Sequence, residues 1–198
     1  MTSSDYAAEW AVAVERTKRF GLEVPSHEVL LTRRYLGDAQ LAEFPYVVQR
    51  GLGDLDFHDV VAQCMAIHFR LVPVIQEWLK CPVLFTLGWI DDGTQRGMFK
   101  FDDGFIASKL KDGHAGGTVN LHAWLTLPSM EVIDVALATT IAVLNKMPNG
   151  HGGVLAGPAN SFNGIAYKPM LVGPDFLRKT GLLVEGAIYM LDDNARNG

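Results

Sequence analysis

Three side chains, Cys64, His122 and Asp134, are of the types that together perform cysteine-nucleophile chemistry. A thiol nucleophile needs a base beside it, conditions that favour the thiolate, and donors for the oxyanion that develops during attack. Cys64 falls near the start of a predicted helix, where the helix dipole and the free backbone N–H groups favour negative charge. His122 is a candidate base, and Asp134 a candidate partner for its second ring nitrogen. The sequence therefore predicts a catalytic triad that acts on an amide or thioester carbonyl.

The triad makes a geometric demand on two predicted strands. His122 and Trp124 lie on one face of an alternating strand segment, and Asp134 lies in the segment that returns after a turn. Because side chains alternate between the faces of a sheet, His122 and Asp134 share a face only if the numbers of paired residues sum to an even value. The three-residue turn Pro128–Met130 gives that register and places Trp124 opposite Asp134. A two-residue turn would place Asp134 opposite Ala123, on the wrong face.

The rest of the chain must position these residues. Segment 59–80 carries apolar residues at steps of three and four, which predicts a helix bearing Cys64, with a kink or break near Pro73. Other helices are expected at 3–20 (capped by Ser3 or Ser4), at 26–36, at 136–146, after Pro174 and, as a helix or an irregular connection, at 103–111. Strands are expected at 82–90, with a short partner at 98–101, and at 118–127, 131–135, 165–172 and 182–191, with a loop at 147–164. Helices followed by mostly antiparallel strands are typical of an α+β fold, expected here as a single domain over 1–198.

Two segments resemble the transglutaminase-like and papain-like cysteine hydrolases. AQCMAI at 62–67 resembles the Gln-Cys-Trp segment that opens the active-site helix of transglutaminase-like proteins, and HAWLTLPSMEVID at 122–134 resembles their His-x-Trp strand with an Asp on the next strand. The resemblance spans about residues 60–136. It implies N-terminal helices and a central active-site helix packed on an antiparallel sheet. Two departures are Met65, where the family has an aromatic residue, and Val-Ala-Leu after Asp134, which lacks the family's Pro or Thr.

Carried over, the resemblance implies Cys64 as nucleophile, with its backbone N–H as one oxyanion donor. It implies His122 as general base and then acid, Asp134 as the orienting residue, and Trp124 as a wall of the site. Residues near Cys64 are candidates for the second oxyanion donor: Gln63, His58 and Gln49. The implied substrates are peptides, glutamine side chains or peptidoglycan peptides, and no cofactor is required.

Two alternatives remain open at this stage. Cys64 lies on an apolar helical stripe, so it is also compatible with a buried structural residue in a binding or scaffolding protein of the same fold. Cys64, His68 and His58 form a candidate zinc set, in which Cys64 and His68 are four residues apart on one helical face. The Cys64–His68 pair lacks the acidic neighbour and third ligand of recognised helical zinc motifs.

Composition narrows the classes of partner. The formal net charge of −5 argues against a nucleic-acid-binding protein, and no apolar run reaches the length of a membrane span. The N-terminal residues show no secretory leader, and the two cysteines are expected as free thiols in the cytoplasm. A protein or peptide substrate is expected, and the oligomeric state is left undetermined.

Overall fold

The protein is an α+β molecule built on one antiparallel sheet of five strands, seen in a computed structural model that describes residues 5–53, 63–116, 119–147 and 151–183. The strand order in the sheet is β4-β3-β2-β1-β5. The strands are β1 (Leu84–Asp91), β2 (His122–Thr126), β3 (Glu131–Asp134), β4 (Leu155–Pro158) and β5 (Ala166–Val172). The predicted α+β class and the antiparallel sheet are therefore confirmed.

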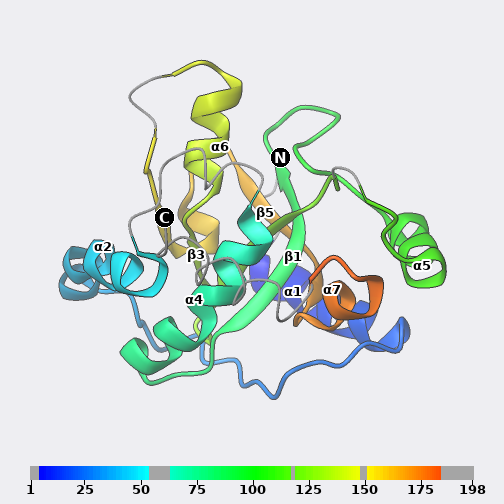
Figure 1. The fold of residues 1–198 in the computed structure, drawn as a ribbon. Helices are drawn as coiled ribbons and strands as arrows, with labels where there is room; N and C mark the ends of the chain where they lie inside the picture. The colour runs from blue at the N-terminus through cyan, green and yellow to red at the C-terminus, as the bar shows by residue number, and fades with distance from the viewer. Residues whose placement is uncertain (1–4, 54–62, 117–118, 148–150, 184–198) are drawn as a thin grey trace, which may run out of the picture.

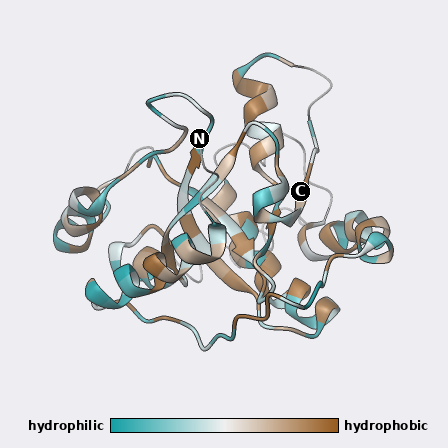
Figure 2. Cartoon of the chain, turned by 180° about the vertical axis from the view of Figure 1, so that it is seen from behind, coloured by the Kyte–Doolittle hydropathy of each residue, from teal (hydrophilic) through white to brown (hydrophobic). Residues whose placement is uncertain are grey.

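Helices cover both faces of this sheet (Figure 1). Helix α4 (Cys64–Leu79) crosses in front of the sheet in Figure 1, and α1 (Tyr6–Arg19), in blue, lies behind it. Alternate residues along β2 belong to two separate apolar clusters, since Ala123 and Leu125 pack in the cluster of α4 whereas Trp124 packs in that of α1. From behind, Figure 2 shows brown along parts of the central strands, whereas the outlying helices carry both brown and teal.

The other helices lie around this core. They are α2 (Asp38–Leu52), α5 (Asp103–Asp112), α6 (Leu137–Leu144), α7 (Asp175–Thr180) and a single 3₁₀ turn, η2 (Ala159–Ser161). Those predicted at 103–111, at 136–146 and after Pro174 are confirmed, as are the strands at 82–90, 118–127, 131–135 and 165–172. Residues predicted as a short strand at 98–101 contribute one bridge, from Met98 to Ile90.

Several predictions near the N-terminus need correction. The helix expected at 26–36 is wrong: this segment is irregular, and the helix begins only after Gly37, as α2. A buried Glu131 carboxylate instead accepts the backbone N–H groups of Tyr35 and Leu36, which holds this segment against β3. The cap of α1 is Asp5, whose side chain accepts from the Ala7 N–H, whereas Ser3 and Ser4 lie outside the described residues.

Two further predictions concern loops and the C-terminal region. The segment 147–164, predicted as a loop, contains β4 and η2, which the Gly- and Pro-rich sequence conceals because a strand of four residues on the sheet edge needs little apolar patterning. The strand predicted at 182–191 falls almost wholly outside the described residues.

Candidate active site

The turn between β2 and β3 has the predicted length and register. Leu125 pairs with Ile133 and Thr126 with Val132, so paired numbers sum to an even value. Met130, the last residue of the three-residue turn, adopts a positive φ of 62°, which reverses the chain. His122 and Asp134 consequently extend from the same face at the same end of the sheet, as predicted.

The two side chains are joined by a short hydrogen bond. Nε2 of His122 lies 2.6 Å from Oδ2 of Asp134, and both residues are buried. Burial alone would lower the pKa of His122 and raise that of Asp134, but the attraction between imidazolium and carboxylate, together with their hydrogen bond, outweighs this cost. The pKa of His122 is therefore raised and that of Asp134 is held well below its usual range.

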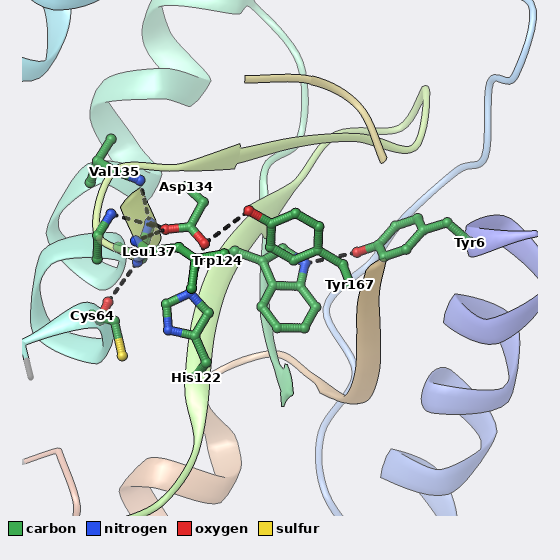
Figure 3. Close-up of polar contacts among 10 residues, drawn as sticks. Tyr6, Cys64, His122, Trp124, Asp134, Val135, Leu137 and Tyr167 are labelled. Atoms are coloured by element: carbon green, nitrogen blue, oxygen red, sulfur yellow. Dashed lines mark hydrogen bonds and ion pairs between the residues drawn. The ribbon is translucent and has the colours of Figure 1, made fainter. Parts of the chain in front are cut away.

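Asp134 is fixed by more donors than His122 alone. Its Oδ1 accepts the backbone N–H groups of Ala136 and Leu137, both at 2.9 Å, at the start of α6. Its Oδ2 also accepts from the hydroxyl of Tyr167 on β5 at 3.0 Å (Figure 3). Burial and the neighbouring Asp134 carboxylate raise the pKa of Tyr167, so this hydroxyl keeps its proton. Four donors therefore hold the carboxylate in one orientation.

Cys64 is the first residue of α4, closer to the helix start than the sequence indicated. Residues in the first turn of a helix have backbone N–H groups without helical partners, and the dipole there favours an anion. The neighbouring Cys64 side chain contributes to the raised pKa of the His122 imidazole, after the larger effects of burial and of Asp134. Figure 3 shows the sulfur beside the His122 ring, facing the nitrogen that Asp134 does not use. Cys64, His122 and Asp134 thus lie next to one another, with His122 in the middle.

Aromatic rings hold the imidazole of His122 from several sides. Phe99 stacks on it with ring centres 5.2 Å apart and an interplanar angle of 22°. Phe99 has a positive φ of 62°, a conformation that costs free energy in a bulky residue and here places the ring over His122. On β1, Gly88 pairs with His122, and a Cβ at Gly88 would come within 2.5 Å of the Trp124 ring, so the missing side chain makes room for that indole.

The remaining predicted site residues have different positions. Trp124 is fully buried, 6.0 Å from the His122 ring centre, and donates its indole N–H to Tyr6, so it supports His122 from within the core rather than lining an open cleft. Gln63 is the exposed N-cap residue of α4, and its side chain makes no capping hydrogen bond. Gln49 lines a separate cavity of about 370 Å³ with Ile67 and Val135. His58 lies outside the described residues.

His68 has a role that the sequence did not reveal. Its Nδ1 lies 2.7 Å from the Cys64 carbonyl oxygen, and its Nε2 accepts the Val135 N–H at 3.1 Å. Both ring nitrogens are thus engaged with backbone groups, which leaves no lone pair for the zinc site considered from the sequence. Among the described residues there is no cluster of three or more His, Cys, Asp or Glu side chains placed to hold a metal.

Tyr167 and Phe99 were also missed. Tyr167 belongs to an edge strand that pairs with β1, so no local rule of register connects it to Asp134. Phe99 follows Gly97 and Met98 in a loop whose return onto β1 gives no strand-like pattern. For His68, the only signal in the sequence was its spacing of four residues from Cys64. This spacing is compatible with a hydrogen bond from the side chain to the backbone carbonyl as well as with a metal site.

Comparison with family models, with curated proteins and with solved structures finds no match for this chain. No helix among the described residues has both the length and the apolar character to cross a membrane. The case for a function therefore depends on the geometry of the site itself.

Proposed function

We propose that this protein is a cysteine hydrolase or acyltransferase, of papain-like or transglutaminase-like kind, that acts on an amide through a thioacyl intermediate. The observation that carries the proposal is the position of Cys64 at a helix start, beside the His122 imidazole that a 2.6 Å hydrogen bond joins to the buried Asp134 carboxylate (Figure 3). This is the arrangement in which a nucleophile, a base and an orienting group act as a unit.

In the proposed reaction, the thiol proton passes to His122 and the sulfur attacks the carbonyl carbon. The tetrahedral oxyanion accepts the backbone N–H of Cys64 at the start of α4. Collapse of this intermediate breaks the C–N bond, and His122 gives its proton to the departing amine. Water or a second amine then attacks the thioester with His122 as base, which releases the product and restores the thiol.

One cavity among the described residues has space for a substrate side chain. A cavity of about 400 Å³ is lined by Lys100, Phe101, Asp102, Phe105 and Asn120. Asn120, one of the lining residues, precedes His122 by two residues in the sequence, and a peptide substrate is proposed to bind in this cavity. A protein or peptide substrate therefore suits the site.

The experiment is alkylation of the native protein with iodoacetamide at pH 6, read by mass spectrometry. Cys81 is a matched control because it and Cys64 have the same exposed fraction, 8%. Burial raises the pKa of Cys81 to about 11, so its thiolate is scarce at pH 6. We expect Cys64 to react at least about 100-fold faster than Cys81.

A second candidate function is a non-catalytic binding or scaffolding protein on the same frame. The specific observation in its favour is the burial of His122 and Asp134, of which 1% and 0% are exposed, since such pairs also occur as structural ion pairs. Equally slow labelling of Cys64 and Cys81 would favour this function over the enzymatic one. If Cys64 is the reactive thiol, Cys64→Ala should trap the bound substrate for identification.

A further inference from the structure

We propose that His68 is a positioning residue that sets the distance between the nucleophile and its base by tying the first turn of α4 to the end of β3. The inference rests on the proposed function, because it assigns His68 a part in the Cys64–His122–Asp134 site. His68 does not touch the reacting atoms and acts through the backbone of the two elements that carry them.

The contacts of His68 join the two ends of the triad. One ring nitrogen meets the carbonyl of Cys64, the proposed nucleophile. The other meets the N–H of Val135, the residue directly after Asp134. Because the side chain is fully buried, water does not compete for either bond. A rigid ring therefore spans the gap between the helix start and the strand end, and a shift of either element would break one of the two bonds.

The partners of His68 also fix its proton. A carbonyl oxygen only accepts, so Nδ1 carries the hydrogen, and an amide N–H only donates, so Nε2 offers its lone pair. His68 is therefore neutral in the Nδ1–H form. A second proton, on Nε2, would face the Val135 N–H and eliminate that hydrogen bond.

The charged and titratable groups around His68 come from three elements. Oδ1 of Asp134 on β3 lies 3.6 Å from Nε2, the His122 ring on β2 stands nearly perpendicular with centres 6.4 Å apart, and Cys64 lies on the same helix. Burial lowers the pKa of His68 to about 4, against the opposing pull of Asp134 and with a smaller lowering by His122. The neutral form, and with it both hydrogen bonds, persists at neutral pH.

Two substitutions separate the two bonds. His68→Asn keeps a donor near the position of Nδ1 and loses the acceptor for Val135, whereas His68→Gln keeps an acceptor near Nε2 and loses the donor to Cys64. Thr17 provides a matched control elsewhere: its hydroxyl donates to the Ala13 carbonyl four residues back and accepts from the strand N–H of Val172. Thr17→Val removes the same kind of helix-to-strand link on α1.

The measured quantity is the pH profile of Cys64 alkylation. In both His68 variants we expect the midpoint to rise by about one pH unit and the rate at pH 6 to fall about tenfold, because a displaced imidazole stabilises the thiolate less. Thr17→Val should keep the wild-type midpoint even where it lowers the melting temperature. A purely structural role for His68 would likewise lower the melting temperature and leave the midpoint unchanged, and that result overturns the inference.

The same data distinguish failure of the inference from failure of the proposed function. A midpoint of wild-type Cys64 alkylation near that of a free thiol, about 8.5, would contradict both the proposed function and the role of His68. A low wild-type midpoint that the His68 variants leave in place would sink the positioning role alone. If the variants do not fold, long-range ¹H–¹⁵N spectra of the wild-type imidazoles decide: the Nδ1–H form of His68 supports the inference, and the Nε2–H form refutes it.

Discussion

At the residue scale, Asp134 is the side chain on which the site depends. It is fully buried, and its two oxygens accept from an imidazole, a phenol and two backbone amides. The two oxygens are not equivalent: Oδ1 accepts hydrogen bonds from two backbone amides, and Oδ2 accepts from His122 and Tyr167. This division predicts what an amide at position 134 would do.

Asp134→Asn is expected to lower the rate of Cys64 alkylation at pH 6 by at least about 100-fold. The amide oxygen must occupy the Oδ1 position, because the Ala136 and Leu137 N–H groups require an acceptor there. The NH₂ group then faces Nε2 of His122, so the imidazole must carry its proton on the nitrogen beside the sulfur and cannot act as base. The amide would also leave the Tyr167 hydroxyl without its acceptor.

Tyr167→Phe is the control for that variant. It removes one donor and leaves the His122–Asp134 bond in place, so the alkylation rate should change less than about threefold while stability falls by about 1 kcal/mol. If Cys64 in Asp134→Asn is alkylated at a rate similar to that in Tyr167→Phe, the Asp134 carboxylate does not determine which ring nitrogen of His122 carries the proton.

The sequence revealed part of this residue-scale arrangement. The alternation of faces and the turn length sufficed to place His122 beside Asp134, because both are local to one hairpin. The contacts of His68 with Val135 and of Tyr167 with Asp134 join segments 67 and 33 residues apart. Such contacts depend on how helix and strands pack, which no spacing rule contains.

At the element scale, β1 is the central support of the site. It pairs with β2, which carries His122, and with β5, which carries Tyr167. The register with β5 shifts between Leu87 and Gly88, which leaves Met170 of β5 without a partner on β1. The sequence predicted β1 as a buried strand, but not this shift, which requires knowledge of both neighbours.

Gly88→Ala is expected to destabilise the protein by about 3 kcal/mol. A Cβ would come 2.2 Å from the Lys168 carbonyl oxygen and 2.5 Å from the Trp124 ring, and neither a backbone atom nor a buried indole can move aside cheaply. Gly37→Ala is the matched control, since its Cβ meets only the flexible end of Gln40 at 3.1 Å, and should cost less than about 1 kcal/mol. Urea unfolding measures both, and equal losses would contradict the crowding argument.

The far end of α4 offers a test that should spare the site. Lys80 caps the helix with a positive φ of 51° and an exposed side chain, a conformation that glycine adopts without strain. Lys80→Gly should therefore stabilise the protein by about 1 kcal/mol and leave Cys64 alkylation unchanged. Ala107→Gly, in the exposed interior of α5, should destabilise it by a similar amount. Thermal unfolding measures whether each substitution raises or lowers the melting temperature. A lower melting temperature for Lys80→Gly would refute the strain argument.

At the scale of the whole molecule, the site combines residues from the apolar clusters on the two faces of the sheet. Cys64 packs with the apolar cluster of α4, whereas Trp124, adjacent to His122 on the same strand face, packs with the cluster of α1. A site assembled between two apolar clusters buries several titratable groups. The pKa values of these groups therefore differ between the folded and the unfolded chain. Composition and periodicity predicted the α+β class, but they carry no information about which titratable groups become buried together.

His122 and Asp134 stabilise the folded protein over overlapping pH ranges. His122, with a raised pKa, adds stability that is fully present below the unfolded value of about 6.5 and is lost as the pH rises through its folded value. Asp134, with a lowered pKa, adds stability that is present above about 3.9 and is lost as the pH falls through its folded value. Their mutual stabilisation is therefore complete between about pH 4 and 6.5.

Within that same window His68 acts in the opposite sense. The pKa of His68 is about 4 in the folded protein. Between pH 6.5 and 4 the unfolded chain therefore binds a proton that the folded chain does not, and the free energy of unfolding decreases as the pH is lowered. We expect the free energy of unfolding of the wild type to drop by about 2–3 kcal/mol more than that of His68→Gln between pH 7 and 4.5. Urea unfolding at the two pH values measures this difference, and Thr17→Val should change in parallel with the wild type. Parallel behaviour of His68→Gln as well would mean that His68 is not the buried neutral imidazole that its two backbone partners require.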